Sequence, residues 1–356
     1  MIKNKNKIAV AMSGGVDSSV SAALLKKMGY DCIGIFMKFW HDEKLPDTQG
    51  QNRCCSQESY LRAKSVADYL DIPLYTLNFK KKFKQNVVDK FLHEYRKGKT
   101  PNPCINCNKF IKFDLLLKRI LVLGCTQLAT GHYAIKRKLK NGSYALMKGK
   151  DKKKDQTYFL YNLNQDLLSR VIFPVGGLNK DKVKKLAKKL RLPVLWKEES
   201  QEICFVPPKK LGVFLKQNLR LKPGRIIDKK NNNLGRHDGL ALYTLGQRKN
   251  IKLSGGPYYV MKKDLKNNTL MVTKKPAEIS SNKFKISDCS WVINPPQPGK
   301  VYNIQIRYRT KAEPGRIKIN KKYCEIILNR KVFAVTAGQS AVIYDKNELI
   351  GGGVIN

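Results

Sequence analysis

The stretch Lys7-Ile-Ala-Val-Ala-Met-Ser-Gly-Gly-Val-Asp-Ser-Ser19 decides the fold class of this 356-residue chain. It begins with a short apolar run, typical of a buried strand, and continues through a glycine-rich turn into a helical stretch, Ser18–Met28. Two glycines free backbone amides, Ser18 and Ser19 add hydroxyls, and the helix start adds positive charge, so the turn favours a bound phosphate. No Gly-Lys-Ser/Thr follows at Walker A spacing, which excludes a loop for transfer of a terminal phosphate.

Strand and helix alternate outward from this loop through the first half of the chain. Strict alternation predicts an α/β fold with a doubly wound parallel sheet and helices on both faces. Ligands bind such sheets at the carboxyl ends of the strands, which places Ser13, Met37 and Gly131 at one edge. The expected strands are Lys7–Met12, Cys32–Lys38, Leu74–Phe79 and Gln127–Thr130, and the expected helices are Ser18–Met28, Ser56–Leu70, Phe83–Arg96 and Lys109–Leu123.

Short alternating runs separated by turns replace this pattern after Pro193. They predict a small β-rich central domain and a C-terminal β-barrel, and hence three domains covering 1–205, 206–280 and 281–356. The runs are Arg225–Asp228, Ala241–Thr244, Tyr258–Lys262, Leu270–Thr273, Val301–Tyr308, Arg316–Ile319, Tyr323–Leu328, Val332–Thr336 and Ser340–Tyr344.

Composition narrows the class of protein. Hydrophobic residues make up 42% of the chain, enough for packed cores, and no apolar stretch reaches membrane-helix length. The basic start precedes an apolar run too short for a signal peptide, so we expect a cytoplasmic protein without a membrane partner. Lys and Arg number 70 against 27 Asp and Glu, a formal charge of +43 that favours a nucleic-acid partner. An A/T-rich genome, whose codons write Lys, Asn and Ile, explains the same excess, so charge alone leaves the partner open.

The nine cysteines, an odd number without a signal peptide, indicate a reducing compartment and some functional thiols. In Thr100-Pro-Asn-Pro-Cys-Ile-Asn-Cys-Asn-Lys109, two prolines predict an extended loop before a helix that begins near Cys107, where helix amides favour a nucleophilic thiolate. A redox pair with Cys104, half of a zinc site and incidental cysteines remain alternatives, although the adjacent Cys54-Cys55 is poorly placed for zinc. Cys204, between apolar neighbours, by itself indicates a buried structural cysteine.

Nine short motifs punctuate the chain: S-G-G-V-D-S-S at Ser13–Ser19, F-M-K at Phe36–Lys38, T-P-N-P-x-x-x-C-N-K at Thr100–Lys109, A-T-G-H-Y at Ala129–Tyr133, K-D-Q-T-Y-F-L at Lys154–Leu160, I-C-F at Ile203–Phe205, T-L-G-Q-R-K at Thr244–Lys249, R-Y-R at Arg307–Arg309 and G-Q-S-A-V at Gly338–Val342. In this order they resemble the tRNA-specific 2-thiouridylases, a family of the ATP-pyrophosphatase (PP-loop) superfamily. The resemblance spans essentially the whole chain.

The resemblance implies an ATP-dependent sulfurtransferase. Members of that family replace O2 of the wobble uridine, at tRNA position 34, by sulfur in tRNAs for Lys, Glu and Gln. Uracil O2 would attack the α-phosphate of ATP, release pyrophosphate and leave an adenylated uridine, with Mg²⁺ near Asp17 and the phosphates and AMP as a later product. ATP would contact Ala11, Met12, Ser13, Gly14, Gly15, Val16, Asp17, Ser18, Met37 and Gly131.

The resemblance also implies a sulfur relay between two catalytic cysteines. Cys204 would carry a persulfide received from a cysteine desulfurase or a sulfur-carrier protein. Cys107 would act as its nucleophilic partner, and a Cys107–Cys204 disulfide would form as the sulfur leaves and be reduced afterwards. Well-known members have Asp where this chain has Cys104, which leaves the role of a carboxylate beside the base open.

Contacts to tRNA carry over from the family to ten residues, each with a structural alternative. His132 also suits a satisfied histidine at the sheet edge, and Lys154 a lysine run on a solvated face. Arg307 and Tyr308 occupy adjacent positions of an expected strand and would face opposite sides, where they suit phosphate contact and base stacking. The ten are Asn102, Pro103, Cys104, His132, Lys154, Asp155, Gln156, Arg307, Tyr308 and Gln339.

Two other functions compete with sulfur transfer. An ATP-driven amidotransferase or synthetase, such as an NAD or argininosuccinate synthetase, shares the phosphate loop but needs neither Cys107 nor Cys204. A non-catalytic RNA-binding protein with a degenerate nucleotide fold conflicts with the intact Ser13–Ser19 loop. We assign no metal-ligating residues.

Overall fold

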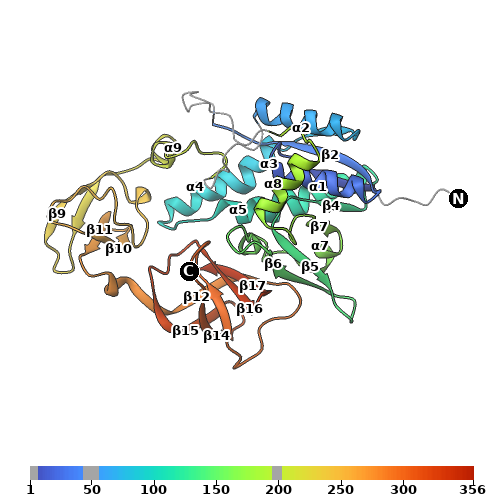
Figure 1. Cartoon of the computed structure of the whole chain (residues 1–356). Helices are drawn as coiled ribbons and strands as arrows, with labels where there is room; N and C mark the ends of the chain where they lie inside the picture. The colour runs from blue at the N-terminus through green and yellow to red at the C-terminus, as the bar shows by residue number, and fades with distance from the viewer. Residues whose placement is uncertain (1–6, 43–55, 195–202) are drawn as a thin grey trace.

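Strand β1 (Lys7–Ala11) lies in the middle of a five-stranded parallel sheet (Figure 1). The computed structural model describes residues 7–42, 56–194 and 203–356. The order β3-β2-β1-β4-β7 places β2 (Asp31–Lys38) on one side of β1 and β4 (Gln127–Ala129) on the other. The strand order reverses at β1, so the loop after β1 lies where open α/β sheets bind ligands. The outer strands are β3 (Leu74–Asn78) and β7 (Val171–Ile172).

Helices cover both faces of this sheet, as the alternation predicts. Successive side chains of β1 point to opposite faces: Ile8 and Val10 join one hydrophobic core, and Ala9 joins another. The first core is closed by α1 (Val16–Lys27), α2 (Gln57–Tyr69) and α8 (Lys180–Lys189). The second is closed by α3 (Lys80–Phe83), η1 (Lys84–Val88), α4 (Asp89–Arg96), α5 (Pro103–Asn106), η2 (Cys107–Leu116), α6 (Leu117–Val122) and α7 (Gln165–Ser169).

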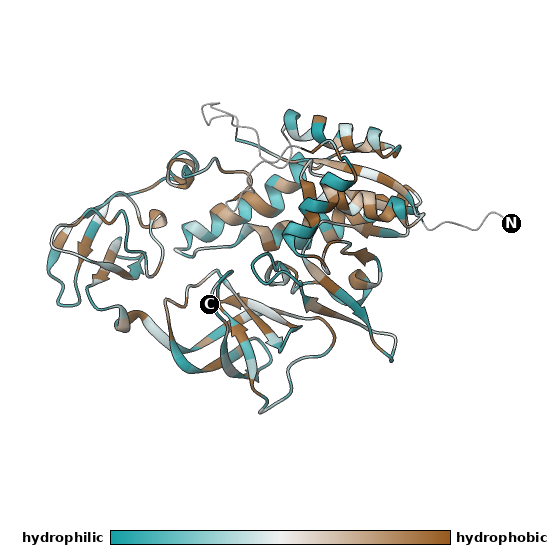
Figure 2. Ribbon diagram, viewed as in Figure 1, coloured by the Kyte–Doolittle hydropathy of each residue, from teal (hydrophilic) through white to brown (hydrophobic). Residues whose placement is uncertain are grey.

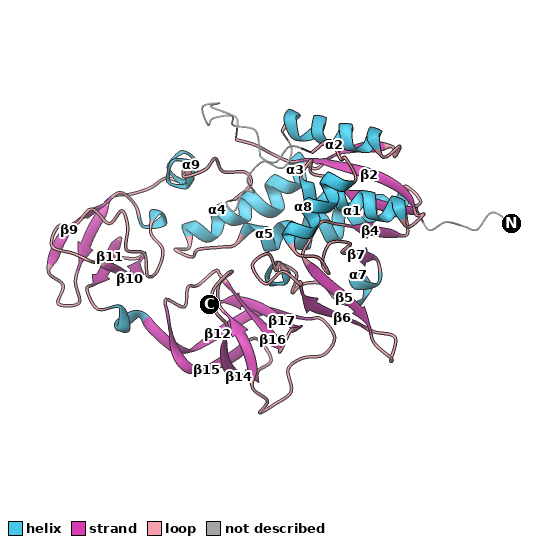
Figure 3. Cartoon of the chain, in the orientation of Figure 1, coloured by secondary structure: helices cyan, strands magenta, loops and turns pink. Residues whose placement is uncertain are grey.

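The distribution of hydrophobic residues and of secondary structure both fit this arrangement of a sheet covered by helices. Figure 2 shows hydrophobic residues along the strands of the first sheet and hydrophilic residues over much of α2 and α8. Figure 3 shows that helices gather around the first sheet, whereas the rest of the chain is mostly strand and loop. The three-layer α/β architecture expected from the sequence is therefore confirmed.

The central part of the chain forms a small four-stranded sheet with its own core. Its order is β10-β11-β8-β9, and Ile226, Val260 and Leu270 are fully buried in it. The strand expected at Ala241–Thr244 is wrong: this segment contains a 3₁₀ turn, η4 (Leu240–Leu242). A run of four apolar residues suits a buried turn as well as a strand. The strands are β8 (Gly224–Ile227), β9 (Asn233–His237), β10 (Tyr259–Asp264) and β11 (Thr269–Thr273), and α9 (Leu211–Asn218) precedes them.

The C-terminal part forms a closed barrel, as expected. Six strands follow the order β12-β15-β14-β13-β16-β17, and pairing of β12 with β17 closes the ring. The strands are β12 (Ser280–Trp291), β13 (Tyr302–Gln305), β14 (Glu313–Ile319), β15 (Cys324–Phe333), β16 (Ser340–Asp345) and β17 (Glu348–Ile355), with the 3₁₀ turn η5 (Pro276–Ile279) before them.

A hairpin from the first half of the chain extends this barrel sheet. Strands β5 (Ala134–Lys138) and β6 (Tyr144–Lys148) lie between β4 and β7 in sequence, yet β6 pairs with β17 through Leu146 and Leu349. Behind the hairpin, η3 (Thr157–Phe159) leads to Tyr161, whose hydroxyl lies 3.1 Å from Ser340 Oγ. The barrel is thus attached directly to the domain that carries the phosphate loop. In the ranges described above, no helix has the length and apolar character needed to cross a membrane.

Candidate nucleotide and thiol site

The loop after β1 turns sharply against the start of α2. Gly14 has a φ of +73°, and a Cβ on Gly14 would lie 2.3 Å from the carbonyl oxygen of Ser59. Only glycine has both the backbone freedom and the space for this turn. The sequence pattern therefore reflects a close approach of two backbone segments as well as a phosphate cradle.

Hydroxyl groups hold the loop in shape from inside. The backbone N–H of Ser13 donates to Ser18 Oγ at 3.3 Å, and the hydroxyls of Ser18 and Ser19 donate to the carbonyl of Gly15 at 2.9 and 3.0 Å. Ser19 is fully buried, so its hydroxyl is turned into the protein. Gly15 is the N-cap of α1, and across the described ranges no side chain caps this helix. Its first amides therefore suit an anionic ligand.

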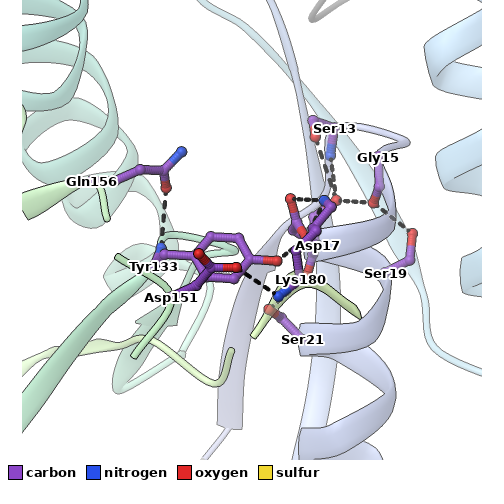
Figure 4. A network of polar contacts seen from close by, with 10 residues as sticks. Ser13, Gly15, Asp17, Ser19, Ser21, Tyr133, Asp151, Gln156 and Lys180 are labelled. Carbon is purple, nitrogen blue, oxygen red and sulfur yellow. Dashed lines mark hydrogen bonds and ion pairs between the residues drawn. The ribbon is translucent and has the colours of Figure 1, made fainter. Parts of the chain in front are cut away.

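Asp17, in the first turn of α1, is the centre of a polar network shown in Figure 4. Its carboxylate accepts a hydrogen bond from the Tyr133 hydroxyl at 2.7 Å and lies 2.7 and 2.8 Å from the Lys180 ammonium. Burial, reinforced by the Asp17 charge, raises the pKa of Tyr133. Burial lowers the pKa of Lys180, and Asp17 opposes that effect. The three side chains therefore form one network, in which a lysine–carboxylate ion pair lies beside a phenol hydroxyl.

Lys180 was not identified from the sequence as a functional residue. It begins a lysine-rich helix, α8, in which local pattern does not separate it from its exposed neighbours. Tyr133 lies inside the A-T-G-H-Y motif, which offered a signal for it. The Asp17–Lys180 pair joins residues 163 positions apart and is visible only in the folded chain.

The other two residues expected to hold the nucleotide lie at the same edge of the sheet. A Cβ on Gly131 would come within 2.9 Å of the backbone nitrogen of Ser18, so the segment after β4 contacts the start of α1. Met37 is the penultimate residue of β2 and is buried. The expected meeting of Ser13, Met37 and Gly131 at the carboxyl ends of neighbouring strands is confirmed.

The helix after the two prolines begins earlier than expected. Asn102 is its N-cap and accepts a hydrogen bond from the backbone N–H of Cys104 at 3.1 Å, so the first turn starts at Pro103. The expected start near Cys107 is wrong, because proline is well suited to the first position of a helix. Cys104 is exposed in the first turn, whereas Cys107 is 8% exposed and begins the π-helical segment η2. The helix therefore starts beside Cys104, one turn before Cys107.

Cys107 and Cys204 contact the same hydrophobic core. Cys107 is a buried member of the cluster beneath the second face of the sheet, and Cys204 is partly buried against it. The neighbour of Cys204, Phe205, places its ring 5.8 Å from that of Phe83 and 5.5 Å from that of Phe91. Residues 200–202 of the S-Q-E-I-C-F segment, and Cys54 and Cys55, lie outside the described ranges.

Several residues expected to contact tRNA also bind other parts of the chain. Asp155 accepts hydrogen bonds from the Gly149 amide and the Thr157 hydroxyl, and burial raises the pKa of its carboxyl. Gln156 Oε1 accepts one from the backbone N–H of Tyr133 at 3.1 Å. Lys154 lies close enough to Lys180 to lower its pKa. The segment 154–156 is therefore connected to the network around Asp17 through Tyr133 and Lys180.

Arg307 and Tyr308 lie in a turn, so the strand expected to carry them is wrong beyond Gln305. Arg307 Nη2 donates to Thr336 Oγ1 at 3.1 Å, and the Tyr308 ring lies 4.4 Å from that of Phe159. The turn bends the chain after β13, because the backbone of Arg309 adopts a φ of +65°.

His132 lies between aromatic rings at the edge of the sheet. Its ring centre is 5.8 Å from Phe113 and 6.2 Å from Phe173, and its Nδ1 lies 2.8 Å from Thr130 Oγ1. Burial and the nearby charge of Lys112 hold its pKa well below the usual value. His132 is therefore neutral at physiological pH, which suits hydrogen bonding to a base better than binding to a phosphate.

Family models match three consecutive parts of the chain. The tRNA methyl transferase HUP domain matches residues 6–208, the tRNA methyl transferase PRC-barrel domain residues 212–274, and the aminomethyltransferase beta-barrel domain residues 281–355.

Full-length relatives carry a different description. The chain is 45% identical over 361 residues to the tRNA-specific 2-thiouridylase MnmA of Carboxydothermus hydrogenoformans, covering 99% of this chain and 98% of the relative. It is 44% identical over 363 residues to that of Nitrosomonas eutropha, covering 99% of each. Among solved structures, the U34-tRNA thiolase NcsA of Methanococcus maripaludis is 20% identical with a TM-score of 0.35, over 57% of this chain and 62% of that one. That structural likeness is too small to support an inference.

Proposed function

This chain belongs to the tRNA-specific 2-thiouridylase family, and from that membership and its site geometry we propose how it replaces O2 of the wobble uridine by sulfur. It is an ATP-dependent sulfurtransferase acting on tRNA. The observation that supports the reaction best is the uncapped start of α1, packed against Gly131 at the carboxyl edge of the sheet. An adenylating enzyme needs an anion cradle of this kind for a triphosphate.

ATP is the substrate that this cradle fits. A Cβ on Gly14 or Gly131 would clash with the backbone of a neighbouring segment, so both glycines allow the chain to close tightly around the start of α1. Ala11–Ser18 would bind the phosphates, and the backbones of Met37 and Gly131 the adenosine end. Mg²⁺ near Asp17 and the phosphates would neutralise charge that develops on pyrophosphate.

The thiols would divide the sulfur chemistry between them. Cys204 receives a persulfide from a cysteine desulfurase or a sulfur-carrier protein. Cys107 attacks the inner sulfur of that persulfide, which releases the outer sulfur to the adenylated carbon and forms a Cys107–Cys204 disulfide. AMP then leaves C2 of the uridine and takes the former O2 with it. An external thiol afterwards reduces the disulfide. Both cysteines pack against the same hydrophobic core.

The tRNA would approach across the edge that carries Cys104 and His132. Pro103 and Cys104 lie at the target base, and a neutral His132 contributes a hydrogen bond. Arg307 and Tyr308 contact the backbone or stack on a base from the barrel side. We propose that the substrates are tRNAs for Lys, Glu and Gln. We divide the chain into domains at 1–205, 206–280 and 281–356, and we place the protein in the cytoplasm.

Mass spectrometry of wobble nucleosides tests this function. Total tRNA from cells with and without the protein is digested, and 2-thiouridine derivatives are quantified. We expect them to disappear with the protein and to return with the wild-type chain. Unchanged 2-thiouridine would overturn the function, and a methylated uridine in its place would support the activity named by the family models, since the two products differ in mass.

A further inference from the structure

The phosphate loop carries no positive charge of its own. Within Ser13–Ser19 the single ionisable side chain is that of Asp17, which is negative. The start of a helix contributes only about half a unit of positive charge. Besides Mg²⁺, a site that binds a triphosphate and releases pyrophosphate therefore gains from a cation in another part of the chain.

The fold brings that cation from α8. Lys180 is 8% exposed, and its ammonium lies 2.7 and 2.8 Å from the two carboxylate oxygens of Asp17. Its backbone N–H donates to Asp151 Oδ2 at 3.0 Å, which anchors the start of α8. The Tyr133 hydroxyl donates to the Oδ1 atom of Asp17, which Lys180 also contacts (Figure 4). The ammonium is thus held on the side chain of Asp17, the residue before Ser18 in the first turn of α1.

A buried pair of this kind has a cost that a structural role alone leaves unexplained. Removing two charges from water costs free energy, and replacing a buried ion pair by apolar residues is often neutral or stabilising. Asp17 lies in the turn of α1 that faces the cradle, and its carboxylate is more exposed than the lysine. The Asp17–Lys180 pair therefore keeps a lysine ammonium next to the phosphate loop, where it can interact with an anionic substrate.

We propose, on the basis of the function above, that Lys180 is the phosphate-binding cation of this enzyme. Its ammonium contacts the β- and γ-phosphates of ATP and stabilises the departing pyrophosphate. The bond that breaks joins the α-phosphorus to the bridging oxygen, and its electron pair goes to pyrophosphate as uracil O2 bonds to the α-phosphorus. Lys180 keeps its proton throughout and compensates the charge that pyrophosphate gains.

Binding of ATP and AMP without metal tests this assignment. Calorimetric titrations in EDTA compare the wild type with Lys180→Gln, Lys180→Arg, Asp17→Asn and the double variant Lys180→Gln/Asp17→Asn. Lys185→Gln, an exposed lysine on the same helix, is the matched control. We expect Lys180→Gln to weaken ATP at least about tenfold, the size of a lost charge-assisted hydrogen bond, and AMP less than about twofold. Lys180→Arg should recover part of the loss, and Lys185→Gln should bind as the wild type does.

The double variant separates phosphate contact from neutralisation of Asp17. If Lys180 touches the phosphates, the double variant binds ATP more weakly than Asp17→Asn alone. Recovery of wild-type ATP affinity in the double variant, or equal losses for ATP and AMP in Lys180→Gln, would overturn the proposal. Failure of the proposed function would be seen separately, as tRNA that stays unthiolated with the wild-type protein. The comparison of ATP and AMP binding can still be interpreted in that case.

Discussion

The side-chain amide of Gln339 donates a hydrogen bond to the backbone carbonyl of Thr100 at 2.7 Å, although 239 positions separate the two residues. The backbone N–H of Thr100 in turn donates to the carbonyl of Ala337 at 2.9 Å. The Thr100 hydroxyl lies 3.2 Å from that of Thr244 in the central part of the chain. The barrel and the central part therefore both hold the loop that leads to Cys104 and Cys107.

Loss of the Gln339 amide should disturb thiolation without disturbing ATP. Gln339→Ala removes one hydrogen bond, worth about 1 kcal/mol, and frees the loop before Asn102. We expect a lower kcat for thiolation of tRNA and an unchanged affinity for ATP. Gln297→Ala, an exposed glutamine in the same barrel, is the control. A wild-type kcat in Gln339→Ala would show that the loop keeps its place without this contact.

Gly14 should tolerate no side chain. Gly14→Ala places a methyl group 2.3 Å from Ser59 O, in a left-handed backbone that itself costs roughly 1–2 kcal/mol for alanine. Gly29, at the other end of α1, has a φ of +82° and open space around it, so Gly29→Ala isolates the backbone cost. Thermal unfolding should show a larger loss for Gly14→Ala, and ATP titration should show that only this variant loses binding. Equal losses of Tm would refute the close approach.

The three thiols near the site should behave differently. We expect Cys107→Ser and Cys204→Ser to abolish turnover, because a relay needs one thiol to hold the persulfide and another to attack it. Cys104→Ser should keep substantial activity. After one turnover without reductant, peptide mapping should find Cys107 joined to Cys204. A dominant Cys104–Cys107 disulfide, or an inactive Cys104→Ser, would instead make the exposed Cys104 a working member of the site.

His132 should make the protein less stable as the pH falls. Its pKa is lowered in the folded chain, so the unfolded chain takes up a proton first, near pH 6.5. Stability is therefore greatest above about pH 6.5 and falls below it, by at most about 1.4 kcal/mol per pH unit from this group. His132→Asn should flatten the fall of Tm between neutral and acidic pH. An unchanged slope would mean that His132 titrates alike in both states.

Arg307 should contribute to tRNA binding through charge. One guanidinium nitrogen donates to Thr336, and a guanidinium carries further N–H donors that suit a phosphate. Arg307→Ala should weaken tRNA binding and lower the slope of log affinity against log salt by about 1. ATP affinity, which should not change, is the internal control. An unchanged salt slope would limit Arg307 to its contact with Thr336.

Local sequence predicted the elements of the first sheet well. The expected strand Cys32–Lys38 differs from β2 by one residue at one end, and the expected helix Ser56–Leu70 differs from α2 by one residue at each end. Periods of two and of 3.6 residues are local properties, and apolar side chains at those periods must face a core. The same reasoning failed where two conformations fit the same short run, as at Ala241–Thr244 and beyond Gln305.

By itself, the sequence determined the phosphate loop, the alternating α/β order, the β-rich second half and the family. The loop and the order of elements depend on neighbouring residues, whose spacing limits the backbone to few conformations. The family follows from short motifs of this kind in a fixed order. Only the tertiary structure decided that Lys180 meets Asp17, that Gln339 holds Thr100 and that the β5–β6 hairpin extends the barrel. Such contacts join segments 163 or 239 positions apart, and they form because burying the apolar faces of whole elements brings these segments together. No short-range pattern distinguishes Lys180 from the other lysines of α8. Packing of the helix against the sheet domain buries its side chain and brings it to Asp17.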